Sequence, residues 1–327
     1  MQVTVYNYRE FDEKEHFDRF KKEYGIELVT CKDAPSLENA VLAKGSTCID
    51  ISTSLMTEEL IKEFASLGIK YITTRTIGYD HIDAKACEKY GVHYGNAPYG
   101  PHGVADYTVM LMLMTLRNTK RIMERTNIQD YTLKGLQGRE LCDLTVAVIG
   151  TGRIGRTVIK NLSGFGCRIL AYDLYENEEV KQNAEYVSLD TIWKEADLIT
   201  LHTPLTEENH HLICDDTLAK MKDGVVLINT ARGPLIDSSA LIRGVESGKV
   251  GAAGLDVVED EFDLYYYDRK SDVLPNRDLA ILRSYPNVTV THHMAFYTNQ
   301  YARTVIGDSL KSCKLFMEGK ENPWQVS

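Results

Sequence analysis

The sequence predicts an α/β protein of two domains, each built around a parallel β-sheet. Short β-rich runs alternate with helical stretches along the chain, and this alternation is typical of sheets built from β-α-β units. The alternation starts a second time at the strand Thr145–Ile149, after a strongly apolar helix predicted over residues 104–116. A chain of 327 residues is also long enough for two domains of ordinary size.

The first series of elements opens with a strand over residues 3–6, followed by a helix over residues 11–24 with a charged outer face. Gly91 ends the last helix of this series. After the helix over 11–24 we expect a strand over 48–52, a helix over 58–67, a strand over 70–74 and, directly before Gly91, a short helix over 84–90.

The second series opens with the strand Thr145–Ile149 and a helix over residues 153–165. The stretch 259–276 contains three successive tyrosines and several charges, and we expect an irregular loop that covers a site or takes part in a subunit contact. The other expected elements are strands over 168–172, 198–202, 225–229, 251–255 and 288–291, and helices over 190–196, 238–247 and 301–317.

The charge balance argues against two classes of partner. Lys and Arg number 37 against 47 Asp and Glu, which gives a net charge of −10. A protein with this balance is a poor ligand for nucleic acid or for an anionic membrane surface. A local site can still bind a small anionic substrate.

Cysteines and the N-terminus indicate the compartment. Seven cysteines include no C-x-x-C pair, and an odd number is typical of reduced thiols in a cytoplasmic protein. The N-terminal residues carry neither a basic segment nor a long apolar run, so we expect no signal peptide. The most apolar run, Tyr107–Leu116, is too short to span a bilayer. We therefore expect a cytoplasmic protein with no metal and no membrane partner.

A G-x-G-x-x-G motif follows the strand Thr145–Ile149 directly and opens a helical pattern. This context is the one that a dinucleotide-binding turn requires: one glycine makes the tight turn, one lets the backbone approach a pyrophosphate, and one lets helix and strand pack closely. The pyrophosphate then binds free N–H groups at the start of the helix. The motif and the first residues of the helix are Gly150, Thr151, Gly152, Arg153, Ile154 and Gly155.

Asp173 ends the next strand, 18 residues after Gly155. A carboxylate at this place accepts hydrogen bonds from the adenosine ribose and repels a 2′-phosphate. Leu174, Tyr175 and Glu176 offer no cation to receive such a phosphate. The sequence therefore favours NAD(H) over NADP(H); the alternative is a solvated aspartate without a ligand.

Three residues in the C-terminal half have the chemistry that hydride transfer to a keto acid needs. A cation must hold the carboxylate, a proton donor must act near neutral pH, and a third group must tune that donor. Arg232, Glu261 and His293 supply these types in order. The alternatives are an ordinary surface arginine and a solvated acidic loop, since Glu259 and Asp260 are also acids.

The segments around the glycine motif, Arg232, Glu261 and His293, with two more in the N-terminal third, closely resemble those of the D-2-hydroxyacid dehydrogenases. Within this family the sequence is most similar to the D-lactate dehydrogenase branch, including the type found with vancomycin resistance. The resemblance covers essentially the whole chain. It implies two Rossmann-like domains with doubly wound parallel sheets. It further implies that an NAD-binding domain over 100–295 is inserted into a substrate domain of 1–99 and 296–327, with the active site in the cleft between them. The segments that carry it are GTGRIG, RTIGYDHID, NAPYGPHGVADY, NTARGPLID, GLDVVEDE and THHMAFYT.

The resemblance implies roles for the three chemical residues. Arg232 would grip the substrate carboxylate and carbonyl, because its planar fork matches a carboxylate. His293 would be the general acid in reduction, and Glu261 would favour its charged form. The family normally has Pro-His where this chain has His292 and His293, which makes His293 the catalyst. Neighbouring strand residues also point to opposite faces, so only one of the two should enter the site.

Further contacts come from the resemblance alone, each against the alternative of simple packing. Ile77 and Gly78 would give backbone N–H groups to the substrate carboxylate, and Tyr99 and Phe296 would line the pocket. Around the dinucleotide the matching residues are Thr203, Pro204 and Asn209, and beside the nicotinamide they are Thr230, Ala231 and Asp256, the last facing the carboxamide.

The first expectation for function is therefore NAD-dependent reduction of pyruvate to D-lactate. One departure favours larger branched or aromatic 2-keto acids: Ser52, Thr53 and Ser54 stand where D-lactate dehydrogenases often place an aromatic residue. An alternative of another class is an NAD-sensing binding protein on the same fold, as in the related corepressors. A phosphoglycerate-type enzyme is disfavoured because no regulatory domain follows residue 327. The apolar helix after Val104 suggests a homodimer surface, with a buried core helix as the alternative.

Overall fold

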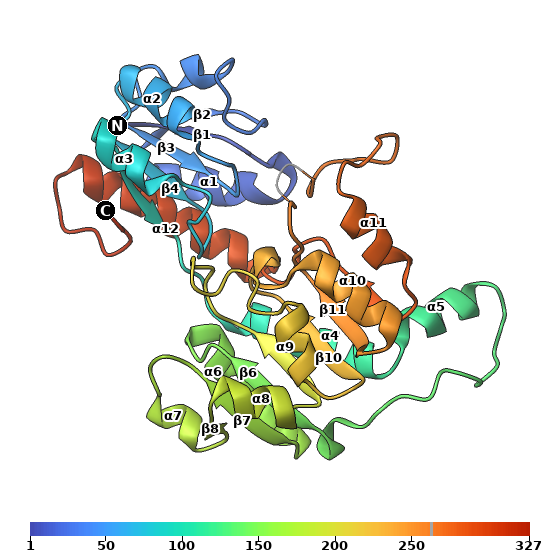
Figure 1. Cartoon of the computed structure of the whole chain (residues 1–327). Coiled ribbons are helices and arrows are strands. Elements are labelled where there is room, and N and C mark those ends of the chain that lie inside the picture. The colour runs from blue at the N-terminus through green and yellow to red at the C-terminus, as the bar shows by residue number, and fades with distance from the viewer. Residues whose placement is uncertain (262–263) are drawn as a thin grey trace. The chain divides into compact units, whose positions relative to one another are not determined.

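The computed structural model describes residues 1–261 and 264–327, which form two compact units. Unit 1 consists of Met1–Gly100 and Tyr297–Ser327, and unit 2 is Pro101–Phe296. Unit 2 is therefore inserted in the chain of unit 1, and both boundaries lie one residue from the expected ones (Figure 1). Among the described residues, no helix is long and apolar enough to cross a membrane.

Unit 1 contains a five-stranded parallel sheet in the order β2-β1-β3-β4-β5. Buried Ile49, Ile72 and Phe64 belong to the core that forms on it. The helices α1 and α12 pack on each other, and α2 packs on α3. The elements are β1 Gln2–Val5, α1 Glu10–Tyr24, β2 Glu27–Thr30, β3 Cys48–Ile51, α2 Glu58–Ser66, β4 Tyr71–Thr74, α3 Ala84–Tyr90, β5 His93–Asn96 and α12 Asn299–Met317.

Unit 2 contains a seven-stranded parallel sheet in the order β12-β11-β10-β9-β6-β7-β8. Two clusters of buried apolar side chains form its core. Its strands are β6 Thr145–Ile149, β7 Arg168–Tyr172, β8 Glu185–Tyr186, β9 Leu198–Leu201, β10 Val225–Asn229, β11 Val250–Leu255 and β12 Val288–Val290. Its α-helices are α4 His102–Leu116, α5 Thr119–Asn127, α6 Arg153–Leu162, α7 Glu178–Lys181, α8 Leu189–Glu195, α9 Asp215–Lys220, α10 Ser238–Ser247 and α11 Arg277–Ser284.

The strand order of unit 2 reverses direction between β6 and β9, because β7 pairs with β6 on one side and β9 pairs with it on the other. In doubly wound sheets a ligand binds at such a point, outside the carboxyl ends of the strands. The carboxyl end of β6 leads directly into the glycine motif. The fold therefore puts the expected cofactor motif where this architecture binds ligands.

One expected helix is shorter than the sequence predicts. The helix expected over 153–165 ends at Leu162, and a tighter 3₁₀ turn, Ser163–Phe165, replaces its last residues. Gly166 then adopts a left-handed conformation with φ of 76°. Glycine accepts this conformation without a steric penalty, so the chain turns there towards β7.

Helix α4 is apolar because most of its surface is covered by unit 2 itself. It packs against α6, β10 and β11, and Leu111 and Met112 are fully buried. Met110 on the same helix is 40% exposed. The helix is therefore a core helix on one side and leaves part of its apolar surface uncovered on the other.

Candidate active site

The glycine motif makes a tight turn between β6 and α6. A Cβ on Gly155 would lie 1.9 Å from the carbonyl oxygen of Gly150, and a Cβ on Gly150, whose φ is +92°, would lie 2.6 Å from the backbone of His202. A Cβ on Gly152 would meet no atom within 4 Å. Two of the glycines are thus required by the fold, whereas Gly152 keeps the surface at the start of α6 open. This arrangement fits a pyrophosphate on the first N–H groups of α6, which begins at Arg153.

Asp173 lies against this turn. One carboxylate oxygen accepts hydrogen bonds from the backbone N–H and the hydroxyl of Thr151, at 2.6 and 3.2 Å, and the other accepts one from the backbone N–H of Tyr175 at 3.2 Å. A carboxylate can accept about four hydrogen bonds. Asp173 therefore orients the glycine turn and keeps acceptor capacity for a ribose. Leu174 and Tyr175, which follow, are exposed and uncharged.

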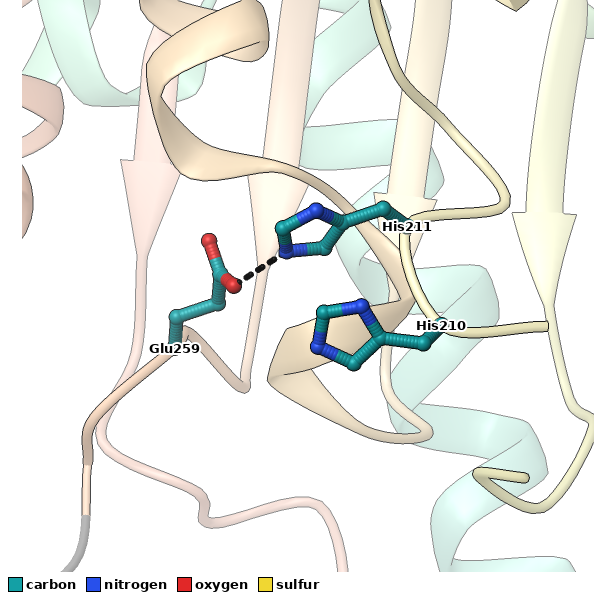
Figure 2. A group of neighbouring side chains, drawn as sticks. All are labelled: His210, His211 and Glu259. Atoms are coloured by element: carbon teal, nitrogen blue, oxygen red, sulfur yellow. Dashed lines mark hydrogen bonds and ion pairs between the residues drawn. The ribbon is translucent and has the colours of Figure 1, made fainter. Parts of the chain in front are cut away.

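The loop after β9 is held by Asn209. Its side-chain N–H groups donate to the carbonyl oxygen of Pro204 at 2.6 Å and to the hydroxyl of Thr203 at 3.3 Å. These three expected cofactor residues thus form one bonded loop at the carboxyl end of the sheet. The loop continues into His210 and His211, whose side chains lie beside Glu259 (Figure 2).

The turn after β10 is also fixed by hydrogen bonds. The Asn229 side chain accepts from the backbone N–H of Ala231 at 3.0 Å and donates to the carbonyl oxygen of Arg232 at 2.8 Å. The hydroxyls of Thr230 and Thr108 lie 2.8 Å apart. These bonds set the backbone from which the Arg232 side chain projects.

His293 and Glu261 form the central pair of unit 2. The imidazole Nδ1 lies 2.6 Å from one carboxylate oxygen of Glu261, and the other oxygen accepts from the backbone N–H of Val258 at 2.9 Å. Burial alone would lower the pKa of His293, but the adjacent carboxylate outweighs it and raises the pKa above its ordinary value. The carboxylate of Glu261 therefore favours the protonated imidazole, which is the form that a general acid needs.

Arg232 is the third member of this group. Its positive charge acts on His293 in the direction that lowers the imidazole pKa, which offsets part of the effect of Glu261. One of its terminal N–H groups donates to the carbonyl oxygen of Ala231 at 2.7 Å. Unit 2 thus brings together a fixed positive charge, a proton donor and the carboxylate that tunes the donor.

The two adjacent histidines lie beyond the end of β12 and differ in their surroundings. The side chain of His293 is 23% exposed and faces Glu261, whereas His292 is exposed and its ring lies edge-on to Tyr265. His293 has a positive φ of 55°, in the left-handed region that only a few per cent of non-glycine residues adopt, histidine more often than most. The structure therefore places His293, and not its neighbour, in the charged group.

Asp256 holds the loop that contains His293 in place. Its carboxylate is fully buried and accepts hydrogen bonds from the backbone N–H groups of Met294 and Ala295, at 2.8 and 2.9 Å, and from the Thr291 hydroxyl. Its carbonyl oxygen accepts from the N–H of His293 at 2.8 Å. Sequence reasoning gave Asp256 a contact with the cofactor only, which stays a prediction. The observed bonds make it a positioning residue for His293.

Aromatic side chains surround the imidazole. The Phe296 ring lies edge-on to His293, with centroids 6.1 Å apart, and also edge-on to Tyr266. The Tyr266 hydroxyl donates to the carbonyl oxygen of His293 at 2.8 Å. Phe296 was expected from sequence, but Tyr266 was not. The expected loop 259–276 contains it and has no helix or strand in its described part; residues 262–263 lie outside the described residues.

In unit 1 the expected carboxylate-binding loop follows β4. The Asn96 side chain donates to the carbonyl oxygen of Ile77, and the Thr76 hydroxyl donates to that of Gly78, both at 2.6 Å. These bonds fix the two carbonyl oxygens, so the peptide planes of the loop have a set orientation. Tyr99 packs edge-on against Tyr301, with centroids 5.1 Å apart. The contacts of these residues with substrate stay predictions.

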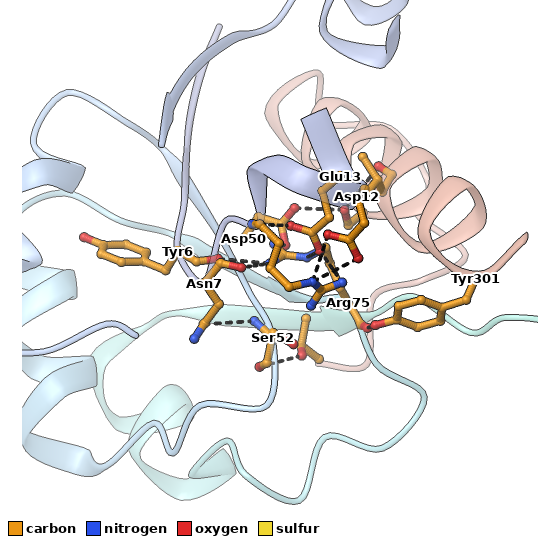
Figure 3. A network of polar contacts seen from close by, with 12 residues as sticks. Tyr6, Asn7, Asp12, Glu13, Asp50, Ser52, Arg75 and Tyr301 are labelled. Carbon is orange, nitrogen blue, oxygen red and sulfur yellow. Dashed lines mark hydrogen bonds and ion pairs between the residues drawn. The ribbon is translucent and has the colours of Figure 1, made fainter. Parts of the chain in front are cut away.

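A buried charged cluster that the sequence did not reveal supports this loop (Figure 3). Arg75, the residue before Thr76, is fully buried and donates to Asp50 at 2.8 Å and to the carbonyl oxygens of Tyr6 and Asn7. Glu13, also buried, lies 3.5 Å from its Nε. The cluster ties the ends of β1, β3 and β4 together. The cluster could not be predicted from a local motif, because Glu13, Asp50 and Arg75 are far apart in the sequence.

Unit 2 thus has the strand order, the glycine turn and the acidic strand end of a dinucleotide-binding domain, together with a tuned proton donor. That combination defines a nicotinamide-dependent oxidoreductase. Residues 109–295 match the family model of the D-isomer-specific 2-hydroxyacid dehydrogenases, NAD-binding domain. The chain belongs to this family: it is a D-2-hydroxyacid dehydrogenase, and its cofactor is NAD.

Relatives that resemble the whole chain carry several names. An aromatic 2-oxoacid reductase of Clostridium sporogenes is 41% identical over 97% of this chain and 96% of its own. A D-specific alpha-keto acid dehydrogenase of Enterococcus faecalis is 41% identical over 97% of both chains. The crystal structure of D-lactate dehydrogenase with NAD⁺ from Lactobacillus jensenii matches with a TM-score of 0.83 and 32% identity, over all of both chains.

Proposed function

We propose that this dehydrogenase reduces 2-keto acids with side chains larger than methyl, aromatic ones foremost, to the (R)-2-hydroxy acids. The proposal depends on the residues that follow β3. Ser52 and Thr53 are small and partly exposed, and Ser54 is bonded to Asn7 at 2.8 Å. No aromatic side chain stands at this place to fill a substrate pocket. The similarity to the C. sporogenes protein, which is named for aromatic 2-oxoacids, supports the same choice.

Pyruvate, the first expectation from sequence, is a poorer substrate than the larger acids in this proposal. The L. jensenii protein is named D-lactate dehydrogenase, so the family includes enzymes for the smallest of these acids. A pocket wide enough for an aromatic ring contacts a methyl group poorly. One methylene in an apolar pocket changes kcat/KM by about 10–200-fold, so the ranking of substrates is measurable.

The roles of the residues in the reaction follow from their chemistry. When bound, NADH supplies the hydride. Arg232 holds the substrate carboxylate with its paired N–H groups. His293, charged because of Glu261, gives its proton to the carbonyl oxygen of the keto acid. In the reverse direction neutral His293 takes the proton from the hydroxyl group.

A panel of 2-keto acids tests the substrate. We expect kcat/KM to be highest for phenylpyruvate, lower for 2-ketoisocaproate and 2-ketobutyrate, and lowest for pyruvate. Ser52→Tyr should lower kcat/KM for phenylpyruvate while preserving that for pyruvate, and Ser52→Ala serves as the matched control. Strict preference of the wild-type enzyme for pyruvate would contradict the proposal. NADH binding with no turnover of any acid would favour the NAD-sensing alternative.

We also propose that the protein is a homodimer formed through α4, α5 and the segment after α5. The uncovered side of α4 contributes a groove lined by Val109, Met110, Leu113 and Met114. Helix α5 has no buried residue, and it and the segment after it extend away from the sheet of unit 2 (Figure 1). The exposed apolar side chains on them are Ile122, Met123, Ile128, Tyr131 and Leu133.

A second copy of the chain is the partner that fits this surface. Exposed apolar patches of this extent mark interaction sites, and a two-fold dimer buries the same patch on both copies. Analytical ultracentrifugation should find a dimer, and Ile128→Asp with Leu133→Asp should convert it to a monomer. Phe11→Asp, at a position in α1 of unit 1 that is 80% exposed, is the matched control and should leave the dimer intact. A monomeric wild-type protein would refute the proposal.

A further inference from the structure

Three potential metal ligands meet in unit 2 at a place that the reaction does not use. His210 and His211 lie in the loop after β9, and Glu259 follows β11 (Figure 2). Their nearest ligand atoms lie within 4.8 Å of one another. Nε2 of His211 lies 2.6 Å from Oε1 of Glu259. Two nitrogen donors and one oxygen donor thus come from segments 48 residues apart.

The backbone makes the two adjacent histidines point the same way. His211 has a positive φ of 54°, and the two rings lie side by side with centroids 4.0 Å apart and an interplanar angle of 32°. In an extended chain, neighbouring side chains point to opposite faces. This local turn therefore gives the pair the shared direction that joint binding of an ion needs.

Two of the three ligands are held in place by neighbouring groups. Oε2 of Glu259 accepts a hydrogen bond from the backbone N–H of Ser238 at 2.7 Å, and the backbone N–H of His211 donates to the carbonyl oxygen of Pro234 at 2.8 Å. Hydrogen bonds to a ligating carboxylate, such as the bond to Glu259, orient metal ligands in known sites, and the backbone bond of His211 fixes the turn that carries its ring. His210 is exposed, so its ring is free to rotate onto an ion.

We propose that His210, His211 and Glu259 form a binding site for a divalent transition metal ion, Zn²⁺ in particular. Imidazole and carboxylate suit Zn²⁺, which binds them at about 2.0–2.2 Å in tetrahedral geometry. Ligand atoms then lie about 3.3 Å apart, so the His211–Glu259 pair opens slightly and His210 approaches. Because His210 is exposed, the fourth position is taken by water.

Metal binding at this site would tether a segment next to the catalytic pair. Glu259 stands between Val258, whose N–H donates to Glu261, and Glu261 itself. His210 directly follows Asn209, which closes the loop after β9. An ion on His210, His211 and Glu259 therefore links these two segments of unit 2, and its binding should raise the thermal stability of the protein.

Titration of the NADH-bound enzyme with ZnCl₂ in a calorimeter tests the site. The Cys142→Ser variant is used throughout, since Glu140, Cys142 and Asp143 form a second exposed group of potential ligands. We expect one Zn²⁺ per chain and a higher melting temperature. His210→Ala should weaken binding by about tenfold or more, since even outer-sphere changes cost about 10–100-fold. His102→Ala, an exposed histidine elsewhere in unit 2, should leave the affinity unchanged.

Two further measurements make the outcome decisive. Co²⁺ should give the strong visible absorption of a tetrahedral complex, and His210→Ala should remove it. Because His210 is exposed, its variant should fold normally, which the melting temperature without metal checks. Equal Zn²⁺ affinity in His210→Ala and His102→Ala, or no Zn²⁺ binding by the wild-type ligand set, would overturn the proposal and leave His211 and Glu259 as a simple hydrogen-bonded pair.

Discussion

At the scale of single residues, the chemistry depends on pairs that sequence order only partly reveals. The proximity of Arg232, Glu261 and His293 was predictable because each stands in a motif with a characteristic order, and unit 2 brings them together; their roles in the reaction stay predictions. Tyr266 and the bonds from Asp256 to the His293 loop were not predictable. They depend on tertiary contacts of a loop and a strand end, and no local pattern encodes such contacts.

Replacing Glu261 tests the tuning of the proton donor. Keto-acid reduction needs charged His293, so activity should persist below the raised pKa of this group and fall as the pH rises through it. Glu261→Gln keeps the shape but removes the carboxylate charge, so the alkaline fall in kcat/KM should move to lower pH. Steady-state kinetics across pH measures this shift.

The matched controls for Glu261→Gln are Glu259→Gln, which removes a nearby acid that bonds His211, and His292→Ala, which removes an exposed ring. Neither should move the pH profile. His293→Ala should lower the rate by about 10²–10⁴-fold, since it removes the general acid. An unmoved profile in Glu261→Gln would remove the tuning role from this residue.

Asp173 should determine the preference for NADH over NADPH. Its carboxylate lies at the glycine turn and would repel a 2′-phosphate, and no cation follows it in sequence. We expect a preference of at least about tenfold in kcat/KM, equivalent to about 1.4 kcal/mol. Asp173→Ala should weaken NADH binding and narrow the preference for NADH. Asp190→Ala, at an exposed position in the first turn of α8, is the control. Equal kcat/KM for both cofactors in the wild type would contradict this role.

At the scale of elements, the sequence predicted best where a buried apolar pattern is strong. For three strands the predicted bounds are identical to the observed ones: Thr145–Ile149, Arg168–Tyr172 and Val225–Asn229. Helix α5 was missed because it is short and mostly polar, and its two large apolar side chains, Ile122 and Met123, are exposed and not part of a core pattern. Other missed elements are short or lie at sheet edges, where partner strands rather than local sequence decide the structure: β2, β5, β8, α7, α9 and α11.

Substitutions of two glycines in the turn between β6 and α6 should have different effects, one on protein stability and the other on NADH binding. Gly155→Ala forces a Cβ to within 1.9 Å of the Gly150 carbonyl oxygen, so the free energy of unfolding should fall by about 1–3 kcal/mol or more. Gly152→Ala meets open space and should leave the apo-protein stable while weakening NADH binding. Thermal unfolding and NADH fluorescence titration measure the two effects. Equal NADH affinity in Gly152→Ala would argue against a cofactor at this surface.

At the scale of the whole molecule, the two units have separate sheets and separate cores. Buried apolar clusters of residues 105–288 belong to unit 2, and the cluster of residues 6–94 belongs to unit 1. The sequence predicted this division because the strand–helix alternation starts twice. It did not predict the charged cluster around Arg75, whose partners come from β3 and α1.

Arg75 should contribute to the stability of unit 1 through this cluster. Arg75→Met leaves the buried carboxylate of Asp50 without its cation, whereas Glu13 keeps Arg9 at 2.8 Å, so the free energy of unfolding should fall by about 3–5 kcal/mol. Arg75→Lys keeps the positive charge, so its free energy of unfolding should fall by less than that of Arg75→Met. Chemical denaturation measures both, and Arg75→Met with Asp50→Asn should recover part of the loss. A fall of less than 1 kcal/mol in Arg75→Met would show that the cluster is not needed for stability.

The insertion of unit 2 into unit 1 orders events on the ribosome. Unit 2 is continuous in the chain, so Pro101–Phe296 can complete its sheet as soon as it emerges. The first hundred residues contain all five strands of the sheet of unit 1 but not its full packing layer, because α12, which packs on α1 and β4, and the hydrogen bond from the Tyr301 hydroxyl to the carbonyl of Arg75 come only with the C-terminal residues. Unit 1 therefore begins to be synthesised first but completes its folding last. Until α12 has been synthesised, part of the sheet of unit 1 stays uncovered while unit 2 folds.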